Sequence, residues 1–170
     1  VNKYSESDLV KIFSEYGEER FSKRIAKAIV EKRRVEPIKT TKELADLIVN
    51  STPHINSRIH PANRVFQAIR IEVNDEIKPL YDTVQNCIDL LKPGGRLCII
   101  TFHSLEDRAV KNAFIDAEGK CICPPGLPYC ACGAVKKGKI ITKKPILPTK
   151  EEMENNSRSK SAKLRIFEKI

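Results

Sequence analysis

The sequence predicts an α/β protein in which a small helical domain precedes the second half of a larger α/β domain. Three observations lead to this class. Residues 1–50 carry apolar side chains at helical spacing, with no strand-like alternation. Residues 97–102 form a nearly continuous apolar run, typical of a strand covered on both faces in a parallel sheet. Because one such strand cannot form a parallel sheet by itself, we expect the chain to be an incomplete domain.

Three short amphipathic helices account for the first third of the chain. Ser5 is placed to open the first helix, and Gly17 to end it. A second helix follows and is stopped by Pro37. Thr40 and Glu43 have the spacing of a capping box, which predicts the start of the third helix.

The middle of the chain is predicted to hold two helices, the apolar strand and a further helix. Pro61 opens a fourth helix, and a break near Pro79 separates it from a fifth helix that leads to the strand. A Pro-Gly-Gly turn precedes the strand, and Ser104 follows it as the expected cap of the next helix. Asp107 is then the expected capping-box partner of Ser104.

The end of the chain is predicted to add strands at one edge of the sheet. Residues 139–142 are a short strand candidate, and Thr149 is placed to cap a short helix. The last segment, 164–170, alternates apolar and polar residues as a strand does. We therefore expect these two strands to form an antiparallel pair.

The charge of +9 is concentrated in the last third of the chain. Residues 120–170 carry twelve Lys and Arg against four Asp and Glu, whereas residues 1–119 carry nineteen against eighteen. Such a distribution favours a polyanionic partner, RNA or DNA ahead of an acidic membrane, over a basic surface without a partner. No apolar run reaches the roughly 18 residues of a membrane span, and no secretory signal is present, so we expect a cytoplasmic protein without membrane contact.

The six cysteines fall into two groups. Cys87 and Cys98 lie in apolar patterns and are expected to be small core residues. The remaining four lie within twelve residues of a proline-rich loop and are candidate ligands of a structural zinc ion: Cys121, Cys123, Cys130 and Cys132. Free thiols are the alternative, and disulfides rank last because a reducing compartment is expected.

Six motifs carry a resemblance to a known family. They are residues 16–26 (YGEERFSKRIA), 40–48 (TTKELADLI), 60–71 (HPANRVFQAIRI), 93–97 (PGGRL), 102–108 (FHSLEDR) and 161–165 (SAKLR). In this order, and over essentially the whole chain, they closely resemble the bacterial 16S ribosomal RNA cytosine-N4 methyltransferases, which use S-adenosylmethionine. Asn63, Ser157 and Lys160 depart mildly from the family pattern and leave its basic character intact.

The resemblance implies a fold, a reaction and a partner. The fold is a Rossmann-like class I methyltransferase domain interrupted by a helical substrate-recognition insertion, with residues 1–72 in the insertion and 73–170, including a Cys-rich loop at 120–133, in the catalytic domain. The reaction is methylation of N4 of cytidine 1402 in the 16S RNA of the small ribosomal subunit. The family's cofactor loop lies upstream of Val1, so no cofactor-binding or catalytic residue is assigned and the chain alone is expected to be inactive. A homodimer is left open.

Two clusters are candidates for binding the RNA substrate around its target base. A stripe across a helix opening, formed by His60, Arg64, Gln67 and Arg70, could contact phosphates or base edges, unless the two arginines make structural ion pairs. His103 stands where the strand passes into the next helix, the edge at which α/β sheets bind ligands. Together with Ser104 and Arg108 it could hold the base or a phosphate, or the segment could simply cap the helix.

A third cluster is basic and lies near the end of the chain. It consists of Arg158, Lys160, Lys163 and Arg165, interleaved with serines. Charge and hydroxyl donors together suit phosphate binding, and the alternative is a flexible solvated tail. A non-catalytic RNA-binding or ribosome-assembly module is the second functional hypothesis, and a zinc-ribbon nucleic-acid adaptor is the third. A glycine-rich strand–loop–helix upstream would favour the enzyme over both.

Overall fold

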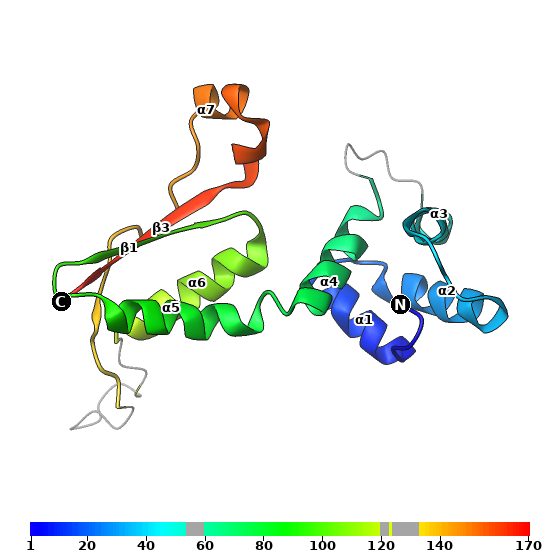
Figure 1. Cartoon of the computed structure of the whole chain (residues 1–170), viewed down its shortest axis with the longest axis horizontal. Coiled ribbons are helices and arrows are strands. Elements are labelled where there is room, and N and C mark those ends of the chain that lie inside the picture. Colours follow the sequence, from blue (N-terminus) through cyan, green and yellow to red (C-terminus); the bar gives the residue numbers. More distant parts are fainter. Residues whose placement is uncertain (54–59, 120–122, 124–132) are drawn as a thin grey trace. The chain divides into compact units, whose positions relative to one another are not determined.

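The computed structural model describes residues 1–53, 60–119, 123 and 133–170 (Figure 1). They form two compact units, Val1–Asp75 and Glu76–Ile170, called here the N-terminal and C-terminal units. The sequence-based division at residue 72 lies close to this boundary, while the interpretation of the first part as an insertion stays a prediction. No helix in the described ranges is long and apolar enough to cross a membrane.

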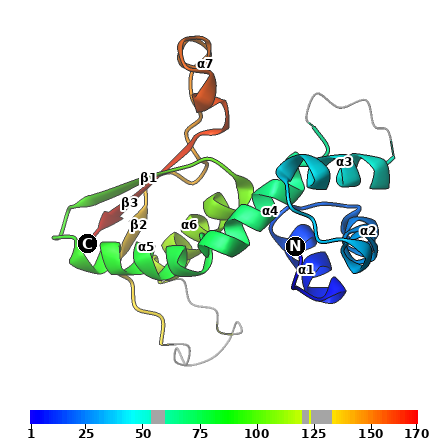
Figure 2. The same cartoon turned by 45° about the vertical axis from the view of Figure 1, so that its right-hand side comes forward.

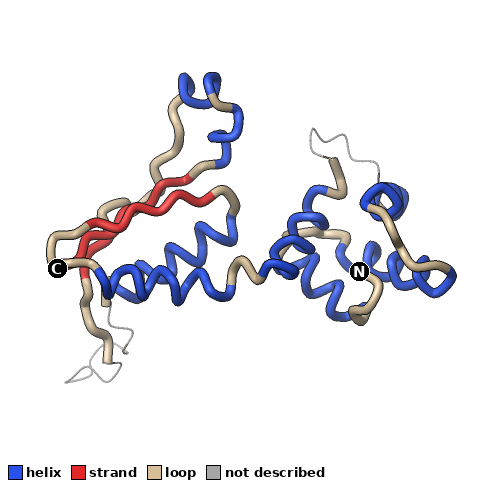
Figure 3. Tube along the Cα trace, in the orientation of Figure 1, coloured by secondary structure: helices blue, strands red, loops and turns tan. Residues whose placement is uncertain are grey.

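Only helices occur in the described part of the N-terminal unit (Figure 3). They are α1 (Glu6–Glu15), α2 (Ser22–Val35), α3 (Thr41–Ser51) and α4 (Asn63–Asn74). Ser5 accepts a hydrogen bond from the Asp8 amide at the start of α1, and Thr40 and Glu43 form the expected capping box of α3. Phe13, Ile25 and Ile48 are completely buried at the centre of the bundle. The four predicted helices and two of their caps are therefore confirmed.

Gly17 allows α1 and α4 to approach closely. A Cβ atom at this position would lie 2.7 Å from the carbonyl oxygen of Arg64 and 2.8 Å from that of Phe13. Such distances are too short for any other side chain, so the turn that follows α1 requires glycine for packing. Gly17 therefore has a role in the packing of α1 against α4, in addition to its predicted role at the end of the helix.

The C-terminal unit is a three-stranded sheet with helices on one face (Figures 1 and 2). Its elements are α5 (Lys78–Leu90), β1 (Arg96–Thr101), α6 (Ser104–Ala117), β2 (Gly138–Ile140), α7 (Lys150–Asn155), the 3-10 helix η1 (Ser157–Ser161) and β3 (Lys163–Lys169). The strand order is β1-β3-β2, and β3 runs antiparallel to both neighbours. The predicted antiparallel pair at the end of the chain is confirmed, as is the cap that Thr149 provides for α7.

The core of this unit lies between the sheet and helices α5 and α6. Phe167 of β3 is completely buried, and its ring centroid lies 5.3 Å from that of Phe114 on α6. Val84 and Ile88 of α5 and Val110 of α6 complete the layer. Burial of these large apolar side chains is the main force that holds the two helices on this face.

The expectation that β1 is covered on both faces is wrong for this chain. Ile100 is 59% exposed and Cys98 is also exposed, whereas Leu97 and Ile99 pack against the core. Successive side chains of a strand point to opposite faces, and the helices that share a core with the sheet, α5 and α6, cover only one of them. Cys98 is therefore not the core residue that its apolar surroundings predicted, and Cys87 is half-buried.

Candidate functional site

The junction between β1 and α6 is held by a capping box that starts one residue earlier than predicted. His103 is the N-cap, and its Nδ1 accepts a 3.4 Å hydrogen bond from the Glu106 amide. The Glu106 carboxylate accepts hydrogen bonds in return from the amides of Phe102 (2.8 Å) and His103 (3.3 Å). The prediction that Ser104 and Asp107 form this box is therefore wrong. An imidazole nitrogen can take the place of a hydroxyl as acceptor, and Asp107 is used elsewhere.

Asp107 forms a largely buried ion pair with Arg165 of β3. The Arg165 Nε and Nη2 atoms donate to the two carboxylate oxygens at 2.6 and 3.0 Å, and the Arg165 residue is only 6% exposed. The hydrogen bonds from Arg165 hold the pKa of the Asp107 carboxyl below its usual value, more strongly than burial raises it. The Lys163 ammonium lies 3.7 Å from the same carboxylate. Arg165, predicted to contact RNA, thus has its guanidinium engaged with Asp107.

His103 also lies close to a second carboxylate. Three potential metal ligands lie within 4.8 Å of one another, as in a metal site: one atom each of Glu76, His103 and Glu106. The Nδ1 atom, however, accepts a backbone hydrogen bond, which in the neutral ring assigns the proton to Nε2. This Nε2 atom is buried and lies 3.2 Å from Glu106 Oε1 without the alignment of a hydrogen bond. A protonated nitrogen does not ligate metal, so the arrangement suits a positioned imidazole better than a metal centre.

The predicted residues at the start of α4 bind the chain's own backbone. Arg64 Nη1 donates to the carbonyl oxygen of Glu18 at 2.9 Å, and Gln67 Nε2 donates to that of Tyr16 at 3.5 Å. His60 Nδ1 accepts from the Ala62 amide at 3.2 Å, and the ring stays exposed. These contacts attach α4 to the turn after α1. Their role in RNA binding stays a prediction.

The basic cluster near the end of the chain is partly brought together with His103. Lys163 pairs with Thr101 in the register of β3 and β1, which places it beside the carboxyl end of β1. Arg158 and Lys160 are exposed on η1, where Ser159 is buried and donates to the Asn156 carbonyl at 2.8 Å. The segment is thus a regular 3-10 helix between α7 and β3, not a free tail. The exposed Arg108 and the half-buried Ser104 lie in the first turns of α6.

Glu106 and Asp107 have structural roles that the sequence reasoning missed. Glu106 follows His103 at the capping-box spacing, so a signal for it was present in the sequence. The partner of Asp107 lies 58 residues away, and no local pattern identifies it. The candidate zinc ligands Cys121, Cys130 and Cys132 lie outside the described residues, and Cys123 is half-buried.

Comparison with known proteins places the chain in a family. Residues 1–170 match the family model described as the MraW methylase family. The chain belongs to this family. It is 55% identical over 171 residues to ribosomal RNA small subunit methyltransferase H 2 of Agathobacter rectalis, an alignment covering 99% of this chain and 54% of that protein.

Two further relatives are similarly close. The ribosomal RNA small subunit methyltransferase H proteins of Caldicellulosiruptor saccharolyticus and Fusobacterium nucleatum are 56% and 55% identical over 170 residues. The alignments cover 100% of this chain and 55% and 54% of those proteins. The chain thus spans about half the length of the curated relatives it matches. The resemblance to ribosomal RNA methyltransferases, based on six motifs, is confirmed.

Proposed function

We propose that this chain is part of an S-adenosylmethionine-dependent methyltransferase that modifies N4 of cytidine 1402 in 16S ribosomal RNA. The observation that carries the proposal is the whole-chain match to the MraW methylase family at about 55% identity to relatives named ribosomal RNA small subunit methyltransferase H. The excess of cations in the last third of the chain supports an RNA substrate. We assign the C-terminal unit to a Rossmann-like catalytic domain and the N-terminal unit to a substrate-recognition insertion.

The cofactor-binding residues are proposed to lie outside this chain. Its seven glycines form no G-x-G-x-x-G pattern, so nothing in the sequence fits the usual nucleotide loop. When bound, S-adenosylmethionine supplies an electrophilic methyl group on sulfonium. Transfer of that methyl group to the exocyclic amine of cytosine would replace the carbon–sulfur bond by a carbon–nitrogen bond and would release one proton from the amine.

The contribution of this chain is to hold and orient the RNA. His103 acts as a positioning residue, because its Nδ1 accepts from the Glu106 amide and its Nε2 is buried next to the Glu106 carboxylate. It fixes the first turn of α6, which carries Ser104 and Arg108, at the carboxyl end of β1. The exposed Arg158 and Lys160 on η1 bind phosphates, and the target base reaches its pocket by leaving the RNA stack.

The proposal is tested in cells that lack the whole gene. This chain is supplied alone or together with the remainder of the protein, and small-subunit RNA is digested and analysed by mass spectrometry for N4-methylcytidine. We expect the modification at the decoding-region cytidine only when both parts are present. Folded protein with both parts and no methylation would refute the proposal. Methylation by this chain alone would refute the assignment of the cofactor site to the remainder.

A further inference from the structure

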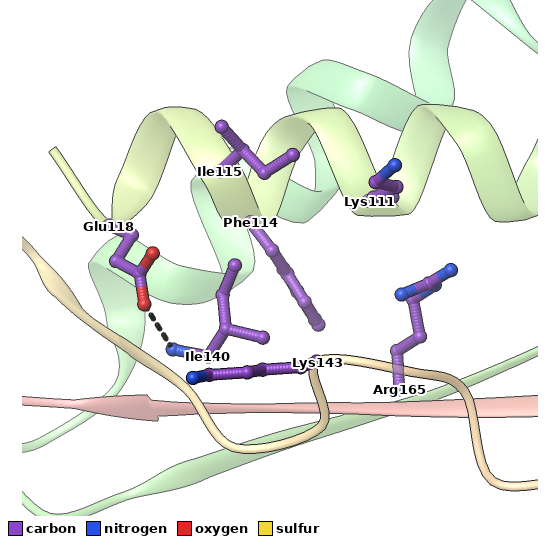
Figure 4. A pocket seen from close by; sticks show the side chains of 7 residues that line it. All are labelled: Lys111, Phe114, Ile115, Glu118, Ile140, Lys143 and Arg165. Carbon is purple, nitrogen blue, oxygen red and sulfur yellow. Dashed lines mark hydrogen bonds between the residues drawn. The ribbon is translucent and has the colours of Figure 1, made fainter. Parts of the chain in front are cut away.

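A pocket of about 300 Å³ lies between α6 and the β2–β3 side of the sheet (Figure 4). It is lined by Lys111, Phe114, Ile115, Glu118, Ile140 and Lys143, together with Arg165. The volume is at the lower end of the range for small-ligand sites and is large enough for a single nucleotide unit.

Two of the cations at this pocket have no counter-charge among the residues that the structure describes. Lys111 and Lys143 are exposed, and neither ammonium forms an ion pair or a hydrogen bond within the described parts of the chain. Some other lysines of the same unit are paired. Lys139 lies 2.7 Å from the Glu168 carboxylate, and Lys137 lies 2.8 Å from that of Asp89. These two unpaired charges line a concave surface, which focuses the positive potential there.

The remaining lining residues make the pocket apolar on its inner side. Phe114 is 1% exposed, and Ile115 and Ile140 are half-buried beside it. Figure 4 shows Phe114 between the side chains of Lys111 and Lys143, with Ile140 next to Lys143 and Ile115 on the same helix as Phe114. An apolar surface flanked by cations matches a nucleotide, whose base and sugar are flat or weakly polar and whose phosphate is charged.

We propose that this pocket binds one nucleotide of single-stranded RNA, with the phosphates on its two sides bound by Lys111 and Lys143. The proposal rests on the proposed function for the identity of the polymer and adds a binding site to it. An acidic protein segment fits less well, because the lining includes the Glu118 carboxylate, which accepts a hydrogen bond from the Ile140 amide at 3.2 Å. This carboxylate can accept hydrogen bonds from nucleotide hydroxyl and amino groups, whereas the side chains of an acidic segment are carboxylates without a donor.

The first test measures binding of the 170-residue chain to a fluorescent single-stranded oligoribonucleotide as a function of salt. Loss of one phosphate contact lowers the salt slope by about 0.7, which is roughly fourfold in affinity at 0.15 M salt. The double variant Lys111→Ala/Lys143→Ala is therefore expected to bind roughly 14-fold more weakly, with a slope smaller by about 1.4. The matched control Lys92→Ala/Lys144→Ala removes two exposed lysines outside the lining and should change affinity less than about twofold.

A second variant separates the pocket from diffuse surface charge. Ile115→Trp fills the cavity without changing charge, and it is expected to weaken RNA binding while circular dichroism confirms an intact fold. Equal losses in the two double variants, or full affinity of Ile115→Trp, would overturn the proposal. If the variant Lys111→Ala/Lys143→Ala no longer binds polyglutamate but binds RNA as before, the pocket would be assigned to an acidic protein instead.

The binding readout does not depend on methyl transfer. If the pocket variants bind RNA more weakly but the protein with both parts present does not methylate it, the proposed function is refuted and the proposed binding site stands. Normal methylation together with unchanged binding by the variants would refute the pocket and leave the function.

Discussion

Replacing Asp107 by alanine is expected to destabilise the C-terminal unit by about 3–5 kcal/mol, because a buried guanidinium would lose its counter-charge. The two hydrogen bonds from Arg165, at 2.6 and 3.0 Å, are charge-assisted and contribute roughly 1.5–3 kcal/mol each. With a side chain only 7% exposed, Arg165 cannot recover this energy from water. The longer contact of Lys163, at 3.7 Å and 35% exposed, adds little because solvent screens it.

Urea denaturation followed by circular dichroism measures the change in the free energy of unfolding. Amide exchange at Phe167 in β3 then assigns the loss to the C-terminal unit. The control Glu31→Ala removes the exposed pair with Lys27, whose charged atoms are 3.9 Å apart, and should cost less than about 0.5 kcal/mol. The double replacement Asp107→Leu/Arg165→Met removes both charges and is expected to be nearly neutral. If Asp107→Ala lowers the free energy of unfolding by less than about 1 kcal/mol, the pair behaves as a surface ion pair and its assignment as a buried pair is refuted.

Three further predictions concern stability. Hydrogen bonds from Arg165 to Asp107, and from Lys139 and Arg96 to Glu168, lower both carboxyl pKa values in the folded state. The contribution of these ionised carboxylates to the free energy of unfolding is therefore complete above about pH 5 and is lost as the pH falls below about 4. Urea titrations at several pH values would measure this decrease in stability. The added Cβ of Gly138→Ala would overlap the Glu168 carbonyl, and the variant should lose more than about 2 kcal/mol of stability in thermal denaturation. The control Gly94→Ala places its Cβ in open space but at φ +79°, and it should lose about 1 kcal/mol. Thr40→Ala removes the cap of α3 and should cost about 1 kcal/mol, and an unchanged melting temperature would contradict that role.

The elements that followed from local sequence are those whose hydrogen bonds are local. The Thr40–Glu43 box and the Thr149 cap each join residues three positions apart, so the local sequence is sufficient to predict them. At α6 the same rule failed by one position. Ser104 and His103 both offer an acceptor, but in the structure the Asp107 carboxylate is bound to Arg165 of β3, and His103 forms the box with Glu106.

Burial and long-range pairing were beyond the sequence. The apolar run at 97–102 predicted a strand correctly, but its letters are compatible with one covered face or two. Only the packing of α5 and α6 shows that Leu97 and Ile99 face the core and Cys98 does not. Similarly, the basic motif near the end of the chain does not reveal which of its cations meets a carboxylate.

By itself the sequence determined the order of helices, the antiparallel strands at the end of the chain and, through motifs over its whole length, the MraW methylase family. These features depend on residues within a few positions of one another or on the letters alone. The tertiary structure alone decided that Arg165 is bound by Asp107, 58 residues away, and that Lys111 and Lys143 meet at one pocket. The physical reason is that the register of β3 and the docking of α6 set these distances, and both depend on the packing of the whole unit.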